Sequence, residues 1–125
     1  MNLEKVLFGF FVVLSLTLNV AFVVGEISDP AHHSIWILFA AMVVNLIATV
    51  LKLGDRSQTG ALLLATALVA DLQLLVCALI WTFADSLTGL PAATTATIVS
   101  LAFGALIANV VSVTLVVSDT LIAGR

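Results

Sequence analysis

Charged residues are scarce in this chain. Only 9% of its 125 residues are Asp, Glu, Lys or Arg, whereas about a quarter are charged in a typical soluble domain. The four cations, Lys5, Lys52, Arg56 and Arg125, form no cluster, and binding to nucleic acid needs a basic patch or stripe. The composition therefore argues against a soluble fold, and we expect no nucleic-acid partner.

Cysteines and catalytic motifs are also scarce. A single cysteine, Cys77, excludes an intrachain disulfide and a cysteine-based zinc site. The sequence contains no Ser/His/Asp set and no glycine-rich phosphate loop, and its polar segments are short. Glu26, Asp29, His32 and His33 share one such segment, but adjacent histidines on a helix point about 100° apart, which suits a shared metal poorly. We therefore expect no enzyme, no metal and no cofactor.

Apolar residues dominate instead, at 62% of the chain, and they occur in four long runs. The first run, residues 6–24, is about 28 Å long as a helix, close to the hydrocarbon thickness of about 30 Å. It exceeds the apolar region of a signal peptide, which is about 7 to 15 residues. The sequence predicts an all-α polytopic membrane protein with one domain, residues 1–125, and four transmembrane helices at about 6–24, 35–51, 61–84 and 94–122.

The breaks between these runs contain helix start and stop signals. Asp29 and Pro30 supply an N-cap side chain and a proline at the first helical position. The second helix is therefore expected to start near Pro30 and to enter the membrane near Ile35. The other signals are a helix stop at Gly54, a cap at Ser57 or Thr59, and a helix start at Pro91.

The distribution of charge predicts the orientation. The four cations fall on one side of a four-helix arrangement, and the loops of the other side carry Glu26, Asp29 and Asp85. Cations favour the cytoplasmic side, so we expect both termini in the cytoplasm. Trp36 and Trp81 fall near the outer ends of their helices and are interpreted as anchors at the membrane interface.

A weak internal repeat relates residues 39–51 to residues 103–115. Phe, Ala, Asn and Leu coincide in the two segments, and Asp55 then falls on Asp119. Two interpretations remain open. The protein consists of two helical hairpins related by a pseudo-twofold axis along the membrane normal, or two apolar runs match by chance.

Each apolar run contains a strongly polar residue, and these are Asn19, Asn45, Asp71 and Asn109, with Gln73 close to Asp71. Such residues face the bundle interior, a cavity or another subunit. The amides alone are explained by hydrogen bonds between helices, worth about 1 kcal/mol or less each. Asp71 costs about 3 kcal/mol at a helix centre and has no Lys or Arg at its depth. We expect it to hold a proton or a cation; the structural alternative is a protonated Asp71 bonded to an asparagine.

The faces of the third helix motivate a homo-oligomer. Asp71 and Gln73 lie about 200° apart around the helix axis, so they cannot share a face. One stripe contains Thr66, Ala70, Gln73 and Cys77, and another contains Ala67, Asp71, Leu74 and Ala78. If one stripe packs inside the monomer, the other needs a second subunit or a pore, because lipid does not satisfy polar groups.

The fourth helix carries small residues at every fourth position, namely Ala92, Ala96, Ser100, Gly104, Ala108 and Ser112. Such a stripe lets helix backbones approach closely. The stripe specifies packing, and the partner is either another helix of the chain or a neighbouring molecule.

Two segments carry a resemblance to a known family. The run Asn-Leu-Ile-Ala-Thr-Val-Leu-Lys-Leu-Gly-Asp-Arg at residues 45–56, followed by Leu-Val-Ala-Asp-Leu-Gln at residues 68–73, resembles small bacterial inner-membrane proteins without an assigned function. The resemblance covers the whole chain. It implies a four-helix membrane protein of a Gram-negative bacterium and supplies no catalytic residues.

The sequence favours a homo-oligomer that handles a small cation or proton, as an ion channel or transport subunit in the bacterial inner membrane. Asp71 is the charged site, and its polar neighbours are Asn19, Asn45, Gln73 and Asn109. The alternative is a non-conducting accessory or scaffold subunit. Its polar residues would only hold helices together, and its small-residue stripe would dock a larger membrane channel or transporter.

Overall fold

The computed structural model describes residues 3–26, 28–55, 57–88 and 90–123, without the side chains of residues 85–88 and 123. Within these ranges the chain forms four α-helices, α1 (Leu3–Val23), α2 (Ile35–Lys52), α3 (Gln58–Thr88) and α4 (Ala92–Ala123), and a short 3-10 helix, η1 (Pro30–His32). All four α-helices are long and apolar enough to cross a membrane. The predicted all-α membrane fold is confirmed, and the chain is a multi-pass membrane protein.

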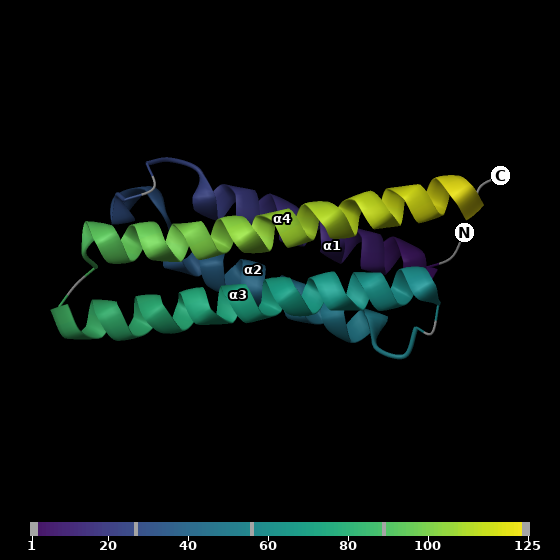
Figure 1. The fold of residues 1–125 in the computed structure, drawn as a ribbon, viewed down its shortest axis with the longest axis horizontal. Coiled ribbons are helices and arrows are strands. Elements are labelled where there is room, and N and C mark those ends of the chain that lie inside the picture. The colour runs from purple at the N-terminus through teal and green to yellow at the C-terminus, as the bar shows by residue number, and fades with distance from the viewer. Residues whose placement is uncertain (1–2, 27, 56, 89, 124–125) are drawn as a thin grey trace.

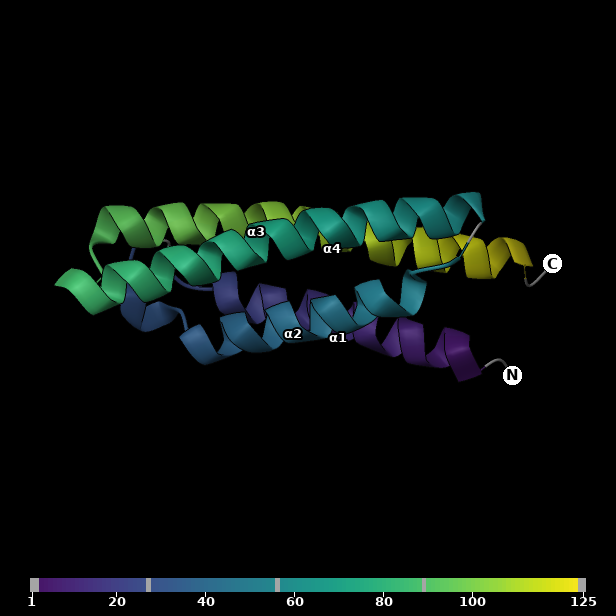
Figure 2. The same cartoon turned by 90° about the horizontal axis from the view of Figure 1, so that it is seen from below.

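The helices run alternately up and down in a bundle (Figure 1). Seen from below, α1 and α2 form one layer and α3 and α4 the other (Figure 2). Consecutive helices contact one another, and contacts between α1 and α4 close the ring. Both chain termini lie at the same end of the bundle (Figure 1). We call this the terminal end, and we call the opposite end, which carries η1, the distal end.

The connection between α1 and α2 differs from the expectation. Pro30 opens η1, with the Asp29 side chain as its cap, and α2 begins only at Ile35. The cap of α2 is Ser34, whose Oγ accepts a hydrogen bond from the Ile37 backbone N–H at 3.4 Å. The predicted helix start near Pro30 is therefore wrong, because the chain turns once more after a single 3-10 turn.

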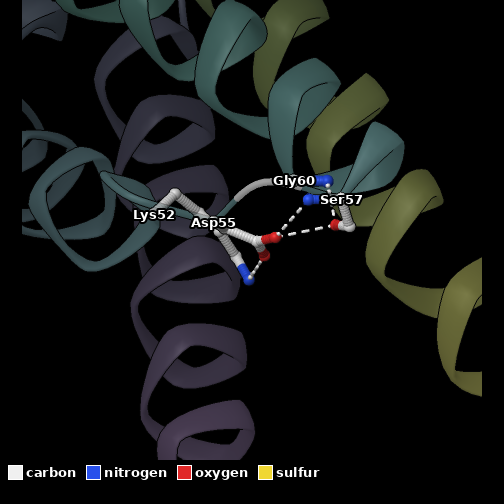
Figure 3. A network of polar contacts seen from close by, with 4 residues as sticks. All are labelled: Lys52, Asp55, Ser57 and Gly60. Atoms are coloured by element: carbon white, nitrogen blue, oxygen red, sulfur yellow. Dashed lines mark hydrogen bonds and ion pairs between the residues drawn. The ribbon is translucent and has the colours of Figure 1, made fainter.

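The connection between α2 and α3 follows the expectation more closely. Gly54 has a φ of 90°, the left-handed conformation that suits a glycine after a helix. Ser57 caps α3, because its Oγ accepts from the Gly60 backbone N–H at 2.9 Å (Figure 3). Lys5 and Lys52 lie at the terminal end, and Glu26 and Asp29 at the distal end. The other charges used for the orientation, Arg56, Arg125 and the Asp85 side chain, lie outside the described residues.

Buried apolar side chains form two clusters along the bundle. The terminal cluster contains Phe8, Val12, Ala48 and Leu63. The distal cluster is larger and extends from the middle of the bundle toward the distal end; its members are Phe22, Val23, Leu38, Ala41, Ala70, Leu74, Cys77, Ala78, Trp81, Ile98, Val99, Ala102, Ala105 and Ala108. Large apolar side chains also cover the outside of all four helices. The lipid bilayer is the medium that fits this outer surface.

The two tryptophans behave differently. Trp36 is 78% exposed, and its role as an interfacial anchor stays a prediction. Trp81 is only 9% exposed, and its ring centroid lies 6.1 Å from that of Phe22. The interpretation of Trp81 as an anchor is therefore wrong, because its ring packs in the bundle core.

Candidate functional site

Asp71 lies on α3 facing α2, where its side chain is only 8% exposed. Asn45 Nδ2 lies 2.6 Å from Asp71 Oδ1, and Thr49 Oγ1 lies 2.5 Å from Asp71 Oδ2. Asn45 and Thr49 are four residues apart on α2 and therefore share one face of that helix. This spacing lets one helix contact both carboxyl oxygens.

The amide orientation of Asn45 is fixed by a second contact. Its Nδ2 also donates to the backbone carbonyl of Ala67 at 3.2 Å. An amide NH₂ has two hydrogens to donate, and both are used here. Asn45 therefore presents hydrogen-bond donors, and not its oxygen, to Asp71.

The Thr49 hydroxyl fits both protonation states of Asp71. Its Oγ1 lies 2.9 Å from the Asn45 carbonyl oxygen as well as 2.5 Å from Asp71 Oδ2. A hydroxyl donates one hydrogen bond and can accept others. It donates to an ionised Asp71; when Asp71 is protonated, it accepts from the carboxyl O–H and donates to the Asn45 carbonyl. Only a hydroxyl hydrogen has to rotate between the two states.

Asn19 and Asn109 form a separate pair between α1 and α4. Hydrogen bonding assigns the Asn19 amide orientation: Nδ2 donates to the Ala102 carbonyl at 3.0 Å, and the oxygen accepts from Asn109 Nδ2 and from the Leu106 backbone N–H, both at 3.1 Å. Both asparagines are buried. Among the described hydrogen bonds, none joins this pair to Asp71.

The two polar groups nevertheless lie at one depth. Thr66 Oγ1 and Ser112 Oγ are 2.6 Å apart, which sets the register of the antiparallel helices α3 and α4. Asp71 lies five residues after Thr66 on α3. Because α4 runs in the opposite direction, the residues at the depth of Asp71 lie about five positions before Ser112, in the turn that contains Leu106. The Leu106 backbone N–H donates to Asn19. A polar layer therefore crosses the bundle between the terminal and distal clusters.

Gln73 lies on the other side of α3 and is not a neighbour of Asp71. It contacts the position of Gly104 on α4, where a Cβ atom would collide with the Gln73 amide. Gln73 lines an open groove of about 310 Å³ between α3 and α4, together with Ala65, Thr66, Val69, Gly104, Ile107 and Ala108. Its Oε1 is buried without a hydrogen-bond partner among the described residues.

Both stripes of α3 pack largely within the monomer. Ala67, Asp71, Leu74 and Ala78 are buried, but so are Ala70 and Cys77 of the other stripe. Thr66 of that stripe is bonded to Ser112. The inference that one stripe needs a second subunit is therefore wrong for all of these residues, because α3 packs against both α2 and α4. Among the described residues of the two stripes, Gln73 is the one with a buried side-chain atom that lacks a hydrogen-bond partner.

The small-residue stripe of α4 is divided in the same way. Ala108 and Ser112 are buried, and Gly104 is half-buried beside Gln73 of the same chain. Toward the distal end, Ala96 is half-buried, and Ala92 and Ser100 are exposed. The half near the polar layer thus faces α3 of the same chain, with Gly104 and Ala108 also lining the groove beside Gln73, and the distal half is more exposed.

Asp71 is separated from the terminal end by apolar side chains. Lys52 Nζ lies 4.4 Å from the centre of the Phe8 ring, which belongs to the terminal cluster. A cavity of about 60 Å³ at this end is lined by Lys5, Phe8, Lys52, Leu63, Val116, Asp119 and Thr120. It reaches Phe8 and Leu63 but not the polar layer. In the part of the chain that is described, no three His, Cys, Asp or Glu side chains are grouped to hold a metal ion.

Thr49 is the site residue that the sequence interpretation missed. A threonine is common in membrane helices and carries little signal by itself. Its position four residues after Asn45 was the available sign, since both side chains then face the same helix.

A model described as a family of unknown function, DUF6394, matches residues 32–120, well over half of the chain. The chain belongs to the DUF6394 family. The matched segment includes Asn45, Thr49, Asp71, Gln73 and Asn109, whereas Asn19 precedes it. No curated protein and no solved structure matches the chain. The expected membership of a family without an assigned function is confirmed, and DUF6394 supplies no activity to transfer to the site.

Proposed function

We propose that this DUF6394 protein is a subunit of an ion channel or transporter that handles protons, and that Asp71 is its proton site. The observation that carries the proposal is the pair of contacts at Asp71. A buried carboxyl in the middle of a membrane helix is bonded by one amide and one hydroxyl, and the hydroxyl suits both protonation states. Intramembrane carboxyls of this kind occur in proton relays.

The orientation of Asn45 favours a proton over a metal cation as the occupant. Metal cations such as Ca²⁺ and Mg²⁺ are held by several oxygen ligands. Asn45 directs its NH₂ group at Asp71 and is held in that orientation by the Ala67 carbonyl. A cation at Asp71 would face these amide hydrogens, whereas a proton on Oδ2 has the Thr49 oxygen as its acceptor.

Access to Asp71 is proposed from the terminal end. There the cavity lined by Lys5, Lys52 and Asp119 ends at Phe8 and Leu63. Separation of these two side chains would open a route from this cavity toward the polar layer. Because the loops with cations mark the cytoplasmic side, we propose that this end faces the cytoplasm of a bacterial inner membrane.

A homo-oligomer is part of the proposal. The buried Gln73 oxygen has no donor among the described residues, and lipid tails supply none. The Gln73 side chain of a second copy carries such a donor. The groove between α3 and α4 is therefore the proposed contact between subunits.

The second candidate is a non-conducting accessory subunit of a larger channel or transporter. The observation in its favour is that the described polar atoms around Asp71 are satisfied and are enclosed by apolar clusters. In this case the polar layer only holds the helices together. The exposed half of the α4 stripe, with Ala92 and Ser100, would dock the larger partner.

Proton flux into liposomes that contain the purified protein tests the proposal. We expect Asp71→Asn to reduce the flux to that of empty liposomes, because asparagine keeps the shape but has no titratable proton. Thr49→Val, which removes the hydroxyl, should lower the flux less completely. The matched control is Asp29→Asn at the distal loop, which makes the same chemical change and keeps a good helix cap.

Equal flux from the native protein and Asp71→Asn would contradict the role of Asp71. No flux from the native protein, in vesicles shown to contain folded oligomer, would favour the accessory subunit. Flux of K⁺ that persists in Asp71→Asn would indicate a channel whose ion path avoids the polar layer.

A further inference from the structure

His33 lies in the short connection between α1 and α2 and is only 4% exposed. Its two ring nitrogens both face backbone carbonyl oxygens. Nδ1 lies 2.6 Å from the carbonyl oxygen of Phe22, and Nε2 lies 2.8 Å from that of Glu26. The imidazole therefore links the last turn of α1 to the chain that follows it.

This arrangement requires two ring protons. A carbonyl oxygen only accepts hydrogen bonds, and a neutral imidazole has one N–H donor and one acceptor nitrogen. With a neutral ring, one carbonyl would face a nitrogen lone pair at less than 3 Å. Only the imidazolium form, which donates from both nitrogens, satisfies both contacts.

The adjacent histidine has the opposite requirement. The Glu26 backbone N–H donates to Nδ1 of His32 at 2.7 Å, so this nitrogen has to be unprotonated. Its Nε2 then carries the hydrogen and lies 3.5 Å from the Asp29 carboxylate. The hydrogen bonds of the loop therefore fit a His32 ring with one proton and a His33 ring with two.

The surroundings of His33 suit a positive charge. The Phe22 carbonyl belongs to the last turn of α1, where the helix dipole favours cations. The loop itself contributes the acidic residues Glu26 and Asp29. From the packed helices, the distal parts of α1, α2 and α4 contribute no charged or titratable residue, and α3 contributes Cys77 and Asp85, whose side chain is outside the described residues.

The ring is also coupled to the core. Its centroid lies 5.6 Å from that of Phe22, and the Phe22 ring packs against Trp81 of α3. The loop around it is tight, because Gly25 has a φ of 105° and a Cβ there would lie 2.7 Å from His32 Cβ. Movement of His33 therefore affects the distal packing of α1 against α3 as well as the loop.

We propose that His33 is a second proton-binding site, distinct from Asp71, and that its imidazolium form closes the α1–α2 connection at the distal end of the bundle. Loss of the second proton leaves one of the two carbonyls without a donor. The ring then keeps a single bond, and the loop opens. The conformation of the distal end thereby depends on whether the His33 ring carries one proton or two.

The first experiment measures hydrogen exchange of the loop amides in the full-length protein in liposomes, at about pH 5 and about pH 8. After correction for the intrinsic pH dependence of exchange, we expect protection of the amides in residues 24–26 and 28–34 to fall by about tenfold or more at the higher pH, as for the loss of a hydrogen bond to a charged group. His33→Gln, which cannot titrate, should remove this pH dependence. His32→Gln is the matched control and should retain it.

The second experiment reads the ring directly. The chain contains two histidines, so the His32→Gln variant leaves His33 alone for ¹⁵N NMR. Two protonated ring nitrogens at about pH 5, and loss of one together with loop opening at higher pH, would support the proposal. A ring with one proton throughout, or a pH response that survives in His33→Gln, would overturn it. Neither measurement uses transport, so the proposal for Asp71 can fail independently.

Discussion

Asp55 illustrates how one exposed carboxylate fixes the connection between two membrane helices. Its Oδ1 accepts from the backbone N–H of Ser57 at 2.9 Å and from Ser57 Oγ at 2.7 Å, and its Oδ2 lies 3.1 Å from Lys52 Nζ (Figure 3). These bonds, led by those from Ser57, lower the pKa of Asp55 to about 2. Gly60 lies beside it, and a Cβ there would meet the carboxylate, which would have to shift.

The lowered pKa predicts a pH dependence for Asp55→Asn. The folded pKa is below the ordinary value of 3.8, so the carboxylate stabilises the fold above that value and loses its effect as the pH falls toward about 2. We expect Asp55→Asn to melt at a lower temperature than the native protein at neutral pH, with the difference vanishing near pH 2. Thermal unfolding in detergent at several pH values measures this difference. A gap of constant size at every pH would show that the charge of Asp55 is not the cause.

At the scale of the helices, the close contact of α3 and α4 depends on Gly104. The sequence predicts a small-residue stripe for packing, and Gly104→Leu is the substitution that would test whether the stripe joins two copies. In the structure a side chain at this position meets Gln73 of the same chain first. The substitution therefore tests the monomer fold before it tests assembly.

We expect Gly104→Leu to destabilise the bundle by about 1 to 3 kcal/mol, the usual cost of inserting a larger side chain into a packed contact. The matched control is Gly9→Leu on α1, because a Cβ at Gly9 has no neighbour within 4 Å. Unfolding in mixed micelles compares the two variants. If both lose the same stability, steric contact with α3 is not the reason.

At the scale of the whole molecule, the charge distribution predicts that the terminal end of the bundle faces the cytoplasm and the distal end faces outward. Impermeant thiol reagents applied to intact cells test this orientation. Glu26 and Ser118 are exposed at opposite ends of the bundle, and native Cys77 is fully buried. We expect Glu26→Cys to be labelled from outside and Ser118→Cys only after lysis, with the native protein unlabelled as the control. The reverse pattern would place the termini outside.

Much of the architecture was predictable from the sequence. Apolar runs located all four helices, although α3 and α4 are longer than their apolar runs because capping by Ser57 and the start after Pro91 lie in polar segments. The predicted start of α2 was wrong because Pro30, capped by Asp29, opens a 3-10 helix that ends at His32. The cap that decides the outcome is Ser34.

The site was predictable only in part. The free-energy cost of placing polar side chains in the bilayer singled out Asp71 and the asparagines. Their spacing along each helix, however, does not say which neighbouring helix each side chain faces. The division into Asn45 with Asp71 and Asn19 with Asn109 depends on the order of helices around the ring. In the internal repeat, Asn45 aligns with Asn109. Each of these two asparagines bonds to a polar residue of a helix from the other hairpin. His33 was considered in the sequence only as a metal ligand, and its burial could not be predicted because its partners are backbone carbonyls.

The enclosure of Asp71 between the terminal and distal clusters affects the rate at which a proton on its carboxyl group would exchange with water. Heavy atoms around the carboxyl need not move when its proton leaves, so the local step is fast. In the proposed route from the terminal end, water has to pass Phe8 and Leu63 before a proton on Asp71 can be exchanged. Under that proposal, the rate at which deuterium replaces the proton is set by how often these two apolar side chains separate.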